Sequence, residues 1–589
     1  MKKFLLYTLA TITGIIIASI LFFIITIASL SVIVASGNKP VTLKDNSILV
    51  LKAGVTIPDR GNPNPWSGFD FSSMSFTPTP GLNDILQNIK KAAVDRKIKG
   101  ILIENGLLSS GWATTDELRN ALLKFRESGK FIISYSDYLL TQEGYFLSTA
   151  ADKIYLNPGA MIDFKGLSGE VMFYKKALDK IGVDVQVIRH GKFKGAVEPY
   201  ILDEMSKENR EQIKDYIGSI WSHVVTDISE SRKIPVNQIN KLADNLVANS
   251  AQDALQCNLI DGLLYQDALI DTLKSLSGTS KKNDLNYISM SKYSKIPDPN
   301  KVFSAANKIA VIYAEGTIVM GKGNETNVGG NYYADIIRDQ RLDSNIKAIV
   351  LRVNSPGGSA VASDIMWREL ELTAKVKPVI VSMGNYAASG GYFISAPGTK
   401  IYASPVTVSG SIGVFGMIPN IGKLLKDKLG ISTETVNTNA NSDFPSVFRP
   451  LNSYELQVMQ KNIENIYSDF VSKVSQGRKM RVTSVDSIGQ GRVWSGIKAK
   501  ELGLIDELGG LTDAIKGAAE FAKIDKYSIR EFPVIEDPYS KIISGLTGEM
   551  KMGILEKELG EYSRYYSEIK ELAAFSGIQA RLPYFIEIH

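Results

Sequence analysis

Apolar and polar positions follow two recurring patterns along this chain. Short apolar runs such as 349–353 and 378–383 are bounded by polar or turn-forming residues, which is typical of buried strands. Between such runs lie stretches such as 362–375, where the apolar residues have helical spacing. Buried strands that alternate with helices predict an α/β architecture with parallel sheets.

This succession of elements occurs twice. IKGILIEN at 98–105 aligns with IKAIVLRV at 346–353, and YFLSTAADKIYLNP at 145–158 aligns with YFISAPGTKIYASP at 392–405. Three further pairs keep the same order: 46–57 with 307–318, 181–188 with 429–436, and 257–270 with 502–515. Repeated segments in a conserved order predict a tandem duplication of one domain.

The patterns divide the chain into five parts. We predict a membrane anchor at 1–37, a first repeat at 46–275, a linker at 276–305, a second repeat at 306–525 and a C-terminal extension at 526–589. The linker is polar and carries two prolines near its end. The extension has no counterpart in the first repeat, and we predict that it is helical. Its stretch 551–574 looks amphipathic, which favours packing or oligomer contacts over catalysis.

The anchor is predicted from the uncharged run between Phe4 and Ser36. A helix rises about 1.5 Å per residue, so this run is long enough to cross an apolar layer of about 30 Å. A cleaved signal peptide has a shorter apolar region and a clearer cleavage site, although cleavage stays an alternative. Lys2 and Lys3 place the N-terminus in the cytoplasm. We therefore predict a single-pass membrane protein whose residues after Gly37 lie outside the cytoplasm.

Composition excludes several classes of function. The formal net charge is only +5 and basic residues are interspersed with acidic ones, so we expect no nucleic-acid partner. Cys257 is the only cysteine, which excludes an intramolecular disulfide and a zinc site built from several thiolates. The chain has three histidines, namely His190, His223 and His589, which is too few for a histidine-rich metal site. We expect no metal and no other cofactor.

The first candidate for chemistry is Ser389, which follows the strand run 378–383 within the sequence AASGGY. A helix is predicted to begin near this serine, and the Gly390 N–H group would then be available to stabilise an oxyanion. A lone serine at such a place is more often a helix cap. However, Gln142 occupies the aligned position in the first repeat, so the two repeats do not share a structural need for serine.

A second feature is the sequence NSPGG at 354–358, directly after the strand run 349–353. Proline and glycine favour a tight turn, and its exposed N–H groups can hold a developing oxyanion. A plain turn is the alternative. The first repeat has NGLL at 105–108 and lacks this feature.

The third candidate is a lysine of the first repeat. The segment GKFKGAVEP at 191–199 contains Lys192 and Lys194, whereas the corresponding stretch 437–448 of the second repeat has no lysine. The serine is thus kept in one repeat and the lysine in the other. This complementary loss predicts one composite Ser–Lys site assembled from both repeats.

These motifs together resemble the long, duplicated form of the signal peptide peptidase SppA family (peptidase family S49, protease IV type). The resemblance rests on NSPGG at 354–358, ASGGY at 388–392, SGSIG at 409–413 and KGAVEP at 194–199. It implies a tandem ClpP/crotonase-like fold of ββα units after an N-terminal transmembrane helix. It also implies membrane-bound peptides, namely cleaved signal peptides, as substrates, and a homo-oligomer, most simply a tetramer.

The resemblance also assigns roles to individual residues. Ser389 matches the nucleophile, Lys194 the general base, and Ser411 the serine that orients this lysine. Gly358 and Gly390 match the oxyanion donors. Lys192 is a local competitor for the base, but the register of the motif selects Lys194.

The predicted reaction is peptide hydrolysis through an acyl-enzyme, with neutral Lys194 accepting the Ser389 proton. Because a free lysine has a pKa of about 10.4, such a base must be buried to be neutral at physiological pH. Three alternatives are a crotonase-type acyl-CoA enzyme, a catalytically silent membrane scaffold, and a peptidase that uses His190. The fold alone does not decide between them.

Overall fold

The computed structural model describes residues 41–54, 56–61, 69–70, 75–76, 80–298, 305–324, 326–534 and 578–582, with scattered positions between 3 and 21. Apart from those scattered positions, the predicted anchor 1–37 lies outside the described residues, and so does the predicted helix 551–574. Within the described part of the chain, no helix has the length and apolar character needed to cross a bilayer.

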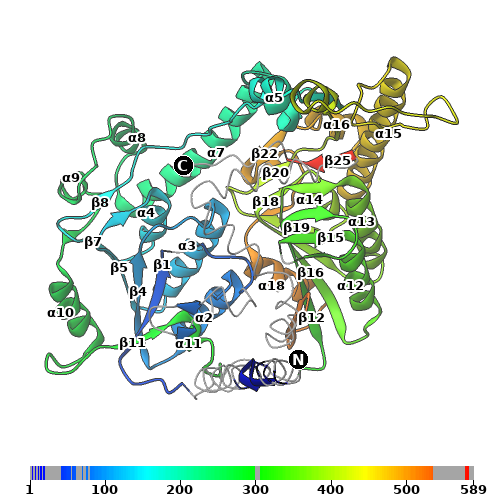
Figure 1. Cartoon of the computed structure of the whole chain (residues 1–589). Helices are drawn as coiled ribbons and strands as arrows, with labels where there is room; N and C mark the ends of the chain where they lie inside the picture. Colours follow the sequence, from blue (N-terminus) through cyan, green and yellow to red (C-terminus); the bar gives the residue numbers. More distant parts are fainter. Residues whose placement is uncertain are drawn as a thin grey trace.

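The first repeat forms a parallel six-stranded sheet, which Figure 1 shows in blue and green on the left. Its strand order is β10 (Gly262–Leu263), β7 (Lys153–Leu156), β5 (Phe131–Ser136), β4 (Ile98–Asn105), β1 (Ser47–Ala53) and β11 (Asn286–Ser289). Its connecting helices include α2 (Leu82–Val94), α3 (Trp112–Arg126) and α4 (Gln142–Ser148). The central strands are buried on both faces, as their continuous apolar runs predicted.

The second repeat forms an eight-stranded sheet beside the first (Figure 1). Its main path is β22 (Val493–Ser495), β20 (Val408–Gly410), β18 (Val379–Ala388), β16 (Ile346–Ser355), β12 (Lys308–Glu315) and β24 (Ser528–Phe532). β19 (Lys400–Ala403) pairs with β18 and with β23 (Glu507–Leu508). All pairs are parallel except β20 with β22. The predicted α/β architecture is therefore confirmed in both repeats.

The two sheets also share a local irregularity. The register between β1 and β4 shifts between Ser47 and Ile48, and that between β12 and β16 shifts between Lys308 and Ile309. The helices of the second repeat include α12 (Gly330–Leu342), α13 (Ala360–Ala374), α14 (Gly390–Ser395) and α18 (Leu511–Phe521). A shared irregularity at aligned positions supports the duplication inferred from sequence.

A third sheet of seven strands joins the two repeats. Its order is β14 (Gly323–Asn324), β15 (Asn327–Gly329), β13 (Thr317–Val319), β17 (Gly357–Ser359), β25 (Ile578–Arg581), β21 (Phe415–Asn420) and β9 (Asp184–Arg189). β9 comes from the first repeat, whereas β25 comes from the segment that was predicted to be helical. The described parts of that segment, 526–534 and 578–582, contain strands β24 and β25 and no helix. They form strands because both pair with the second repeat.

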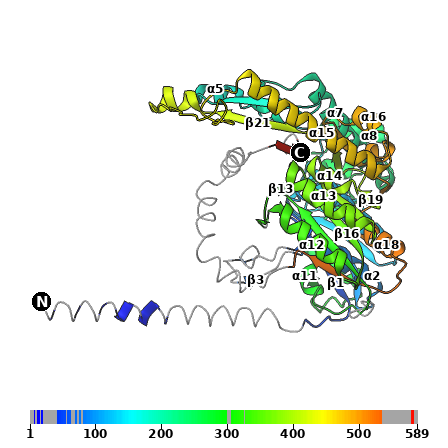
Figure 2. The same ribbon diagram turned by 90° about the vertical axis from the view of Figure 1, so that its right-hand side faces the viewer.

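Two long helices flank the junction of the repeats. α7 (Lys207–Arg232) contacts β22, and α15 (Ser453–Arg478) contacts β9, so each helix reaches across to the other repeat. Figure 2 shows β21 and α5 (Lys175–Ile181) at the end of the molecule opposite to β1 and α2. Among the described residues, the remaining α-helices are α6 (Glu198–Ile201), α8 (Val236–Asp244), α9 (Ala251–Gln256), α10 (Gln266–Ser277), α11 (Met290–Tyr293), α16 (Val482–Ile488) and α17 (Gly496–Glu501).

A buried ion cluster fixes the two repeats to each other. Arg352 of β16 lies 2.7 Å from a carboxylate oxygen of Asp59 and 2.7 Å from one of Glu117 in α3. All three side chains are buried. Removing one partner would leave the others as uncompensated buried charges, which is expected to destabilise the packing of the two repeats.

Candidate active site

Ser389 lies at the turn between β18 and α14 and is fully buried. Its backbone has φ 56° and ψ −116°, a combination that residues with a side chain seldom adopt. Two hydrogen bonds hold this turn: the Ser389 N–H donates to Gly410 O at 2.8 Å, and the Phe393 N–H donates to Ser389 O at 2.8 Å. The side chain stands at the helix start but makes no capping hydrogen bond. The ordinary cap interpretation is therefore wrong for this serine.

Lys194 reaches Ser389 from the first repeat. It lies in the loop after β9, and its Nζ donates to Ser389 Oγ at 2.8 Å. The side chain has no exposed surface. The structure thus brings together, within one chain, the serine of one repeat and the lysine of the other.

Ser411 completes the surroundings of the lysine. Lys194 Nζ donates to Ser411 Oγ at 3.0 Å and to Ser411 O at 3.2 Å. Ser411 itself has φ 51°, and its N–H donates to Arg492 O at 2.7 Å. Hydroxyl and carbonyl oxygens thus fix the direction of the Lys194 side chain without adding a negative charge.

Burial controls the charge of Lys194. Removal from water lowers the pKa of its ammonium group well below the ordinary value, and desolvation is the only cause of this shift. A neighbouring carboxylate would oppose the shift by favouring the charged form. A neutral amine within hydrogen-bond distance of a serine hydroxyl can accept its proton, which is what a general base requires.

Residues that the sequence did not single out hold the lysine in place. The Phe193 N–H donates to Gln490 O at 3.1 Å, and Gln212 of α7 donates to Phe193 O at 2.9 Å. Gly491 has φ 84°, and a Cβ built on it would lie 2.7 Å from Lys194 N. Only glycine fits at this place, because it combines a positive φ with a close approach of two backbones. The isolated pair Gln490-Gly491 carries no sequence signal for this role.

The predicted oxyanion donors, Gly358 and Gly390, belong to the strand β17 and to the start of α14. A methyl group built on Gly357 would lie 2.6 Å from Gly390 N, so the turn after β16 and the start of α14 are in close approach. The Gly357 N–H donates to Ser355 Oγ at 3.1 Å. Gly358 pairs with Ile318 of β13. Gly390 directly follows Ser389 and is the first residue of α14.

The residues that were alternatives to Lys194 as the general base, and the remaining described histidine, have other surroundings. Lys192 is exposed. His190 lies 2.7 Å from Glu464 and stacks on Tyr467, with ring centroids 3.7 Å apart. His223 is bonded to Asp116 at 3.2 Å. Among the described residues, the hydrogen bonds of the Ser389 side chain involve Lys194 and Gly413 and no histidine.

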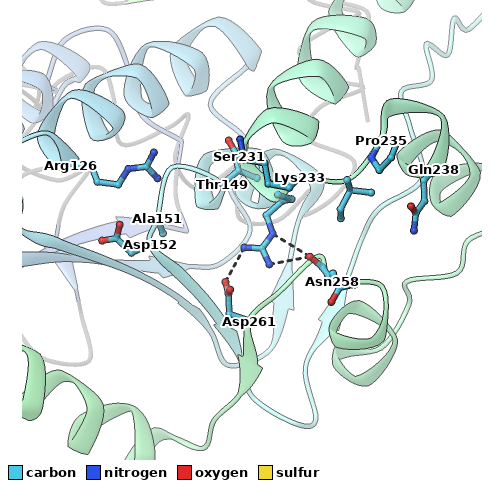
Figure 3. A pocket seen from close by; sticks show the side chains of 12 residues that line it. Arg126, Thr149, Ala151, Asp152, Ser231, Lys233, Pro235, Gln238, Asn258 and Asp261 are labelled. Atoms are coloured by element: carbon cyan, nitrogen blue, oxygen red, sulfur yellow. Dashed lines mark hydrogen bonds and ion pairs between the residues drawn. The ribbon is translucent and has the colours of Figure 1, made fainter.

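A polar cavity of about 560 Å³ in the first repeat is unrelated to this chemistry (Figure 3). Arg232 at the end of α7 is one of its lining residues; it pairs with Asp261 at 2.9 Å and donates to Asn258 O. The second repeat has the same arrangement, since Arg478 at the end of α15 pairs with Asp506 and donates to Gly503 O. Because this arginine–aspartate pair occurs in both repeats, we interpret it as a structural contact that fixes the end of the long helix.

Comparisons with known proteins agree with the geometry. The model of peptidase family S49 matches twice, at residues 124–280 and 371–525, and the Clp protease model matches residues 301–407. Protease 4 of Haemophilus influenzae is 36% identical over 80% of this chain and 79% of its own. Protease 4 of Salmonella typhi is 37% identical over 80% of this chain and 76% of its own. The chloroplastic serine protease SPPA of Arabidopsis thaliana is 32% identical over 85% and 74%.

Fold and comparisons together define a serine peptidase built on a duplicated α/β domain. The chain belongs to peptidase family S49, in its long SppA or protease IV type. The first of the two family matches includes Lys194, and the second includes Ser389 and Ser411.

Proposed function

We propose that this serine peptidase works with a Ser389–Lys194 dyad and cleaves apolar peptides, above all signal peptides left in a membrane. The observation that carries the proposal is the contact of 2.8 Å between Lys194 Nζ and Ser389 Oγ inside a fully buried site. The names of relatives, Protease 4 and the signal peptide peptidase SppA of Enterococcus faecium, support the substrate class.

The reaction begins with proton transfer from Ser389 Oγ to neutral Lys194. The Ser389 oxygen attacks the peptide carbonyl carbon, and the N–H groups of Gly358 and Gly390 stabilise the oxyanion. The protonated Lys194 then gives its proton to the leaving amine, and the C–N bond breaks. Water activated by the same lysine hydrolyses the ester and releases the carboxylate product.

Ser411 acts through Lys194. Its hydroxyl and carbonyl oxygens accept hydrogen bonds from Nζ and aim it at Ser389. No step of this reaction uses a metal or another cofactor, because the lysine supplies the proton transfer and the glycines the electrostatic stabilisation.

The proposal includes a place in the cell. The uncharged segment 4–36 with Lys2 and Lys3 before it supports a single-pass anchor in a bacterial inner membrane, with the peptidase domains outside the cytoplasm. An assembly of several copies, most simply a tetramer, is the corresponding proposal for quaternary structure. Cross-linking in intact membranes tests both.

Single substitutions test the dyad in the full-length chain. Lys194→Ala and Ser389→Ala are expected to abolish cleavage of a fluorogenic apolar peptide, whereas the exposed neighbour variant Lys192→Ala keeps activity. Circular dichroism and thermal unfolding establish that each variant is folded. Full activity in a folded Lys194→Ala protein would remove the lysine from the mechanism.

A further inference from the structure

Asp116, His223 and Asp227 form a compact group of side chains between α3 and α7 of the first repeat. Each of the three offers one ligand atom, and these atoms all lie within 4.8 Å of one another. His223 Nε2 lies 3.2 Å from Asp116 Oδ1 and 3.8 Å from Asp227 Oδ2. Asp116 is buried, and the other two side chains are only 17% exposed. The group therefore collects an imidazole nitrogen and two carboxylate oxygens in a place that is largely shielded from water.

The buried carboxylate of Asp116 needs a positive partner. Within the described part of the chain, it forms no ion pair with a lysine or an arginine, and its side-chain contacts are His223 and Ser404. The Ser404 hydroxyl donates to Asp116 Oδ2 at 2.8 Å. The nearby guanidinium of Arg119 donates to Asp227 instead, from both Nη1 and Nη2. Either a proton on His223 or a metal ion can supply the missing charge.

The distances around His223 favour a metal ion. A charge-assisted N–H···O hydrogen bond measures about 2.7–2.9 Å, and His190 makes such a contact with Glu464, at 2.7 Å. The two distances from His223 Nε2 to the carboxylate oxygens are both longer. A tetrahedral Zn²⁺ ion with bonds of about 2.0–2.2 Å has ligand atoms about 3.4 Å apart, which lies between these two distances. The spacing of the ligand atoms therefore suits an ion at their centre better than one shared proton.

The second repeat holds a cation at the matching place. Its helices α13 and α15 have the same lengths as α3 and α7, and their aligned residues are Asp364, Asp469 and Lys473. Lys473 Nζ donates to both of these carboxylates and so joins the two helices. In the first repeat, Asp227 replaces the lysine and His223 replaces Asp469. The first repeat therefore has three possible ligands where the second has two carboxylates and a built-in ammonium group.

We propose that Asp116, His223 and Asp227 bind a divalent transition-metal ion, for which Zn²⁺ is the best fit. An imidazole ligand favours zinc over magnesium and calcium, and the carboxylates complete the donor set. Water takes the fourth position. Ser404 of the second repeat donates to Asp116 and fixes the direction of its carboxylate. The small number of histidines led to the expectation of no metal, but two of the three protein ligands here are carboxylates.

The ion would join α3 to α7, and both helices also contact parts of the molecule that matter for the active site. Gln212 of α7 donates to Phe193 O, next to Lys194. Glu117 of α3 lies 2.7 Å from Arg352 of the second repeat. An ion that binds only the folded chain stabilises it. Zn²⁺ is therefore expected to stabilise the packing of the two repeats without taking part in peptide cleavage.

Titration of the full-length chain with Zn²⁺ tests this inference, after bound metal has been removed with a chelator at neutral pH. Elemental analysis is expected to find a single Zn²⁺ ion per wild-type chain, and Tm is expected to rise with the Zn²⁺ concentration. Mg²⁺ at the same concentration should give a smaller rise. His223→Asn and Asp116→Asn, checked for folding by circular dichroism, are expected to lose both the ion and the rise. Asp469→Asn, the matched substitution in the second repeat, and His190→Asn are expected to keep both.

The opposite results would overturn the metal site. They are a wild-type chain that retains no stoichiometric Zn²⁺, and binding that survives in His223→Asn or is lost in His190→Asn, which would indicate an adventitious ion only. Burial lowers the pKa of His223, but the hydrogen bond and the charge of Asp116 outweigh this effect and raise it. If a proton alone joins the two carboxylates, Tm does not respond to Zn²⁺ and falls as pH rises through the titration of His223. That result would also contradict the metal site.

Discussion

The two repeats differ at the aligned turns that precede α14 and α4. In the second repeat, Ser389 stands at the start of α14 and its hydroxyl contacts Lys194 instead of capping the helix. In the first repeat, Thr141 caps α4 by accepting from the Gly144 N–H at 3.1 Å. Gln142 accepts hydrogen bonds from the N–H groups of Lys165 and Gly166. In the first repeat, the position aligned with Ser389 thus carries a side chain that holds the loop at 165–166.

The lysine, by contrast, is present in the first repeat and absent from the corresponding stretch of the second. Lys194 is buried in the first repeat, whereas the corresponding stretch of the second repeat, 437–448, has no lysine and is largely exposed. Scaffold features such as the pairs Arg232–Asp261 and Arg478–Asp506 occur in both repeats. A duplicated domain needs its scaffold in both copies but each catalytic group in only one copy. Comparing the two repeats therefore distinguishes residues that support the fold from candidates for catalysis.

The largest expected effect follows from removing either half of the dyad. Ser389→Ala should lower kcat/KM by about 10⁶-fold, as loss of a nucleophile does in other serine peptidases. Lys194→Ala should lower it by about 10²–10⁴-fold or more, the usual contribution of a general base. Steady-state kinetics with a fluorogenic peptide measures both. Equal activity of the two variants and the wild type would contradict the conclusion that the serine of one repeat and the lysine of the other form the catalytic pair.

The second prediction concerns Ser411. Loss of one hydrogen bond is worth about 1 kcal/mol, so Ser411→Ala should lower kcat by roughly fivefold and leave KM nearly unchanged. The Ser411 carbonyl oxygen still accepts from Lys194 in this variant, which is why the loss is smaller than for the lysine itself. An effect as large as that of Lys194→Ala would show that Ser411 takes part in proton transfer directly.

The third prediction uses the cost of burying Lys194. Because its pKa in the folded state is lowered, the unfolded chain binds more protons below the ordinary lysine pKa, and the wild type becomes more stable as pH rises. Lys194→Met removes this dependence and should raise Tm at neutral pH, by an amount that shrinks as pH approaches about 10.4. Calorimetry at several pH values measures it. A destabilised Met variant at neutral pH would contradict the burial argument.

The smallest effect is expected in the first repeat. Thr141→Ala removes a helix cap and should cost about 1 kcal/mol of stability without changing kcat. The matched substitution Gln142→Ser should not create activity in a chain that carries Ser389→Ala, since no lysine of the second repeat replaces Lys194. Urea unfolding and the peptide assay check these outcomes. Activity restored by Gln142→Ser would show a second site.

Local patterns were sufficient to predict the buried strands, the duplication and the place of Ser389 between a strand and a helix. The comparison of the repeats predicted that a lysine of the segment 191–199 would meet Ser389, because neither has a counterpart in the other copy, and the family resemblance selected Lys194 over Lys192. It could not predict the third sheet, whose strands β9, β17, β21 and β25 come from distant parts of the chain. The pattern in 526–589 favoured a helix, since pairing across more than 160 residues leaves no local trace.

The residues that support the site could not be predicted from the sequence either. Gly491 and Gln212 act on Lys194 only once the repeats are packed together, and neither belongs to a motif. The strained backbone of Ser389 also depends on a distant partner, the carbonyl oxygen of Gly410. The sequence singled out the candidate catalytic groups, whereas the residues that position them were recognised only from their contacts in the folded chain.

The rate at which a fluorophosphonate labels Ser389 tests the central claim most directly, because the reagent reports activation of the serine without a peptide substrate. The adduct is located by mass spectrometry in the wild type, Lys194→Ala and Lys192→Ala from acidic to alkaline pH. The account predicts an adduct on Ser389 whose rate of formation rises with pH as Lys194 loses its proton, and which nearly disappears in Lys194→Ala alone. Equal labelling in the wild type and Lys194→Ala, or an adduct on another serine, would contradict a dyad shared between the two repeats.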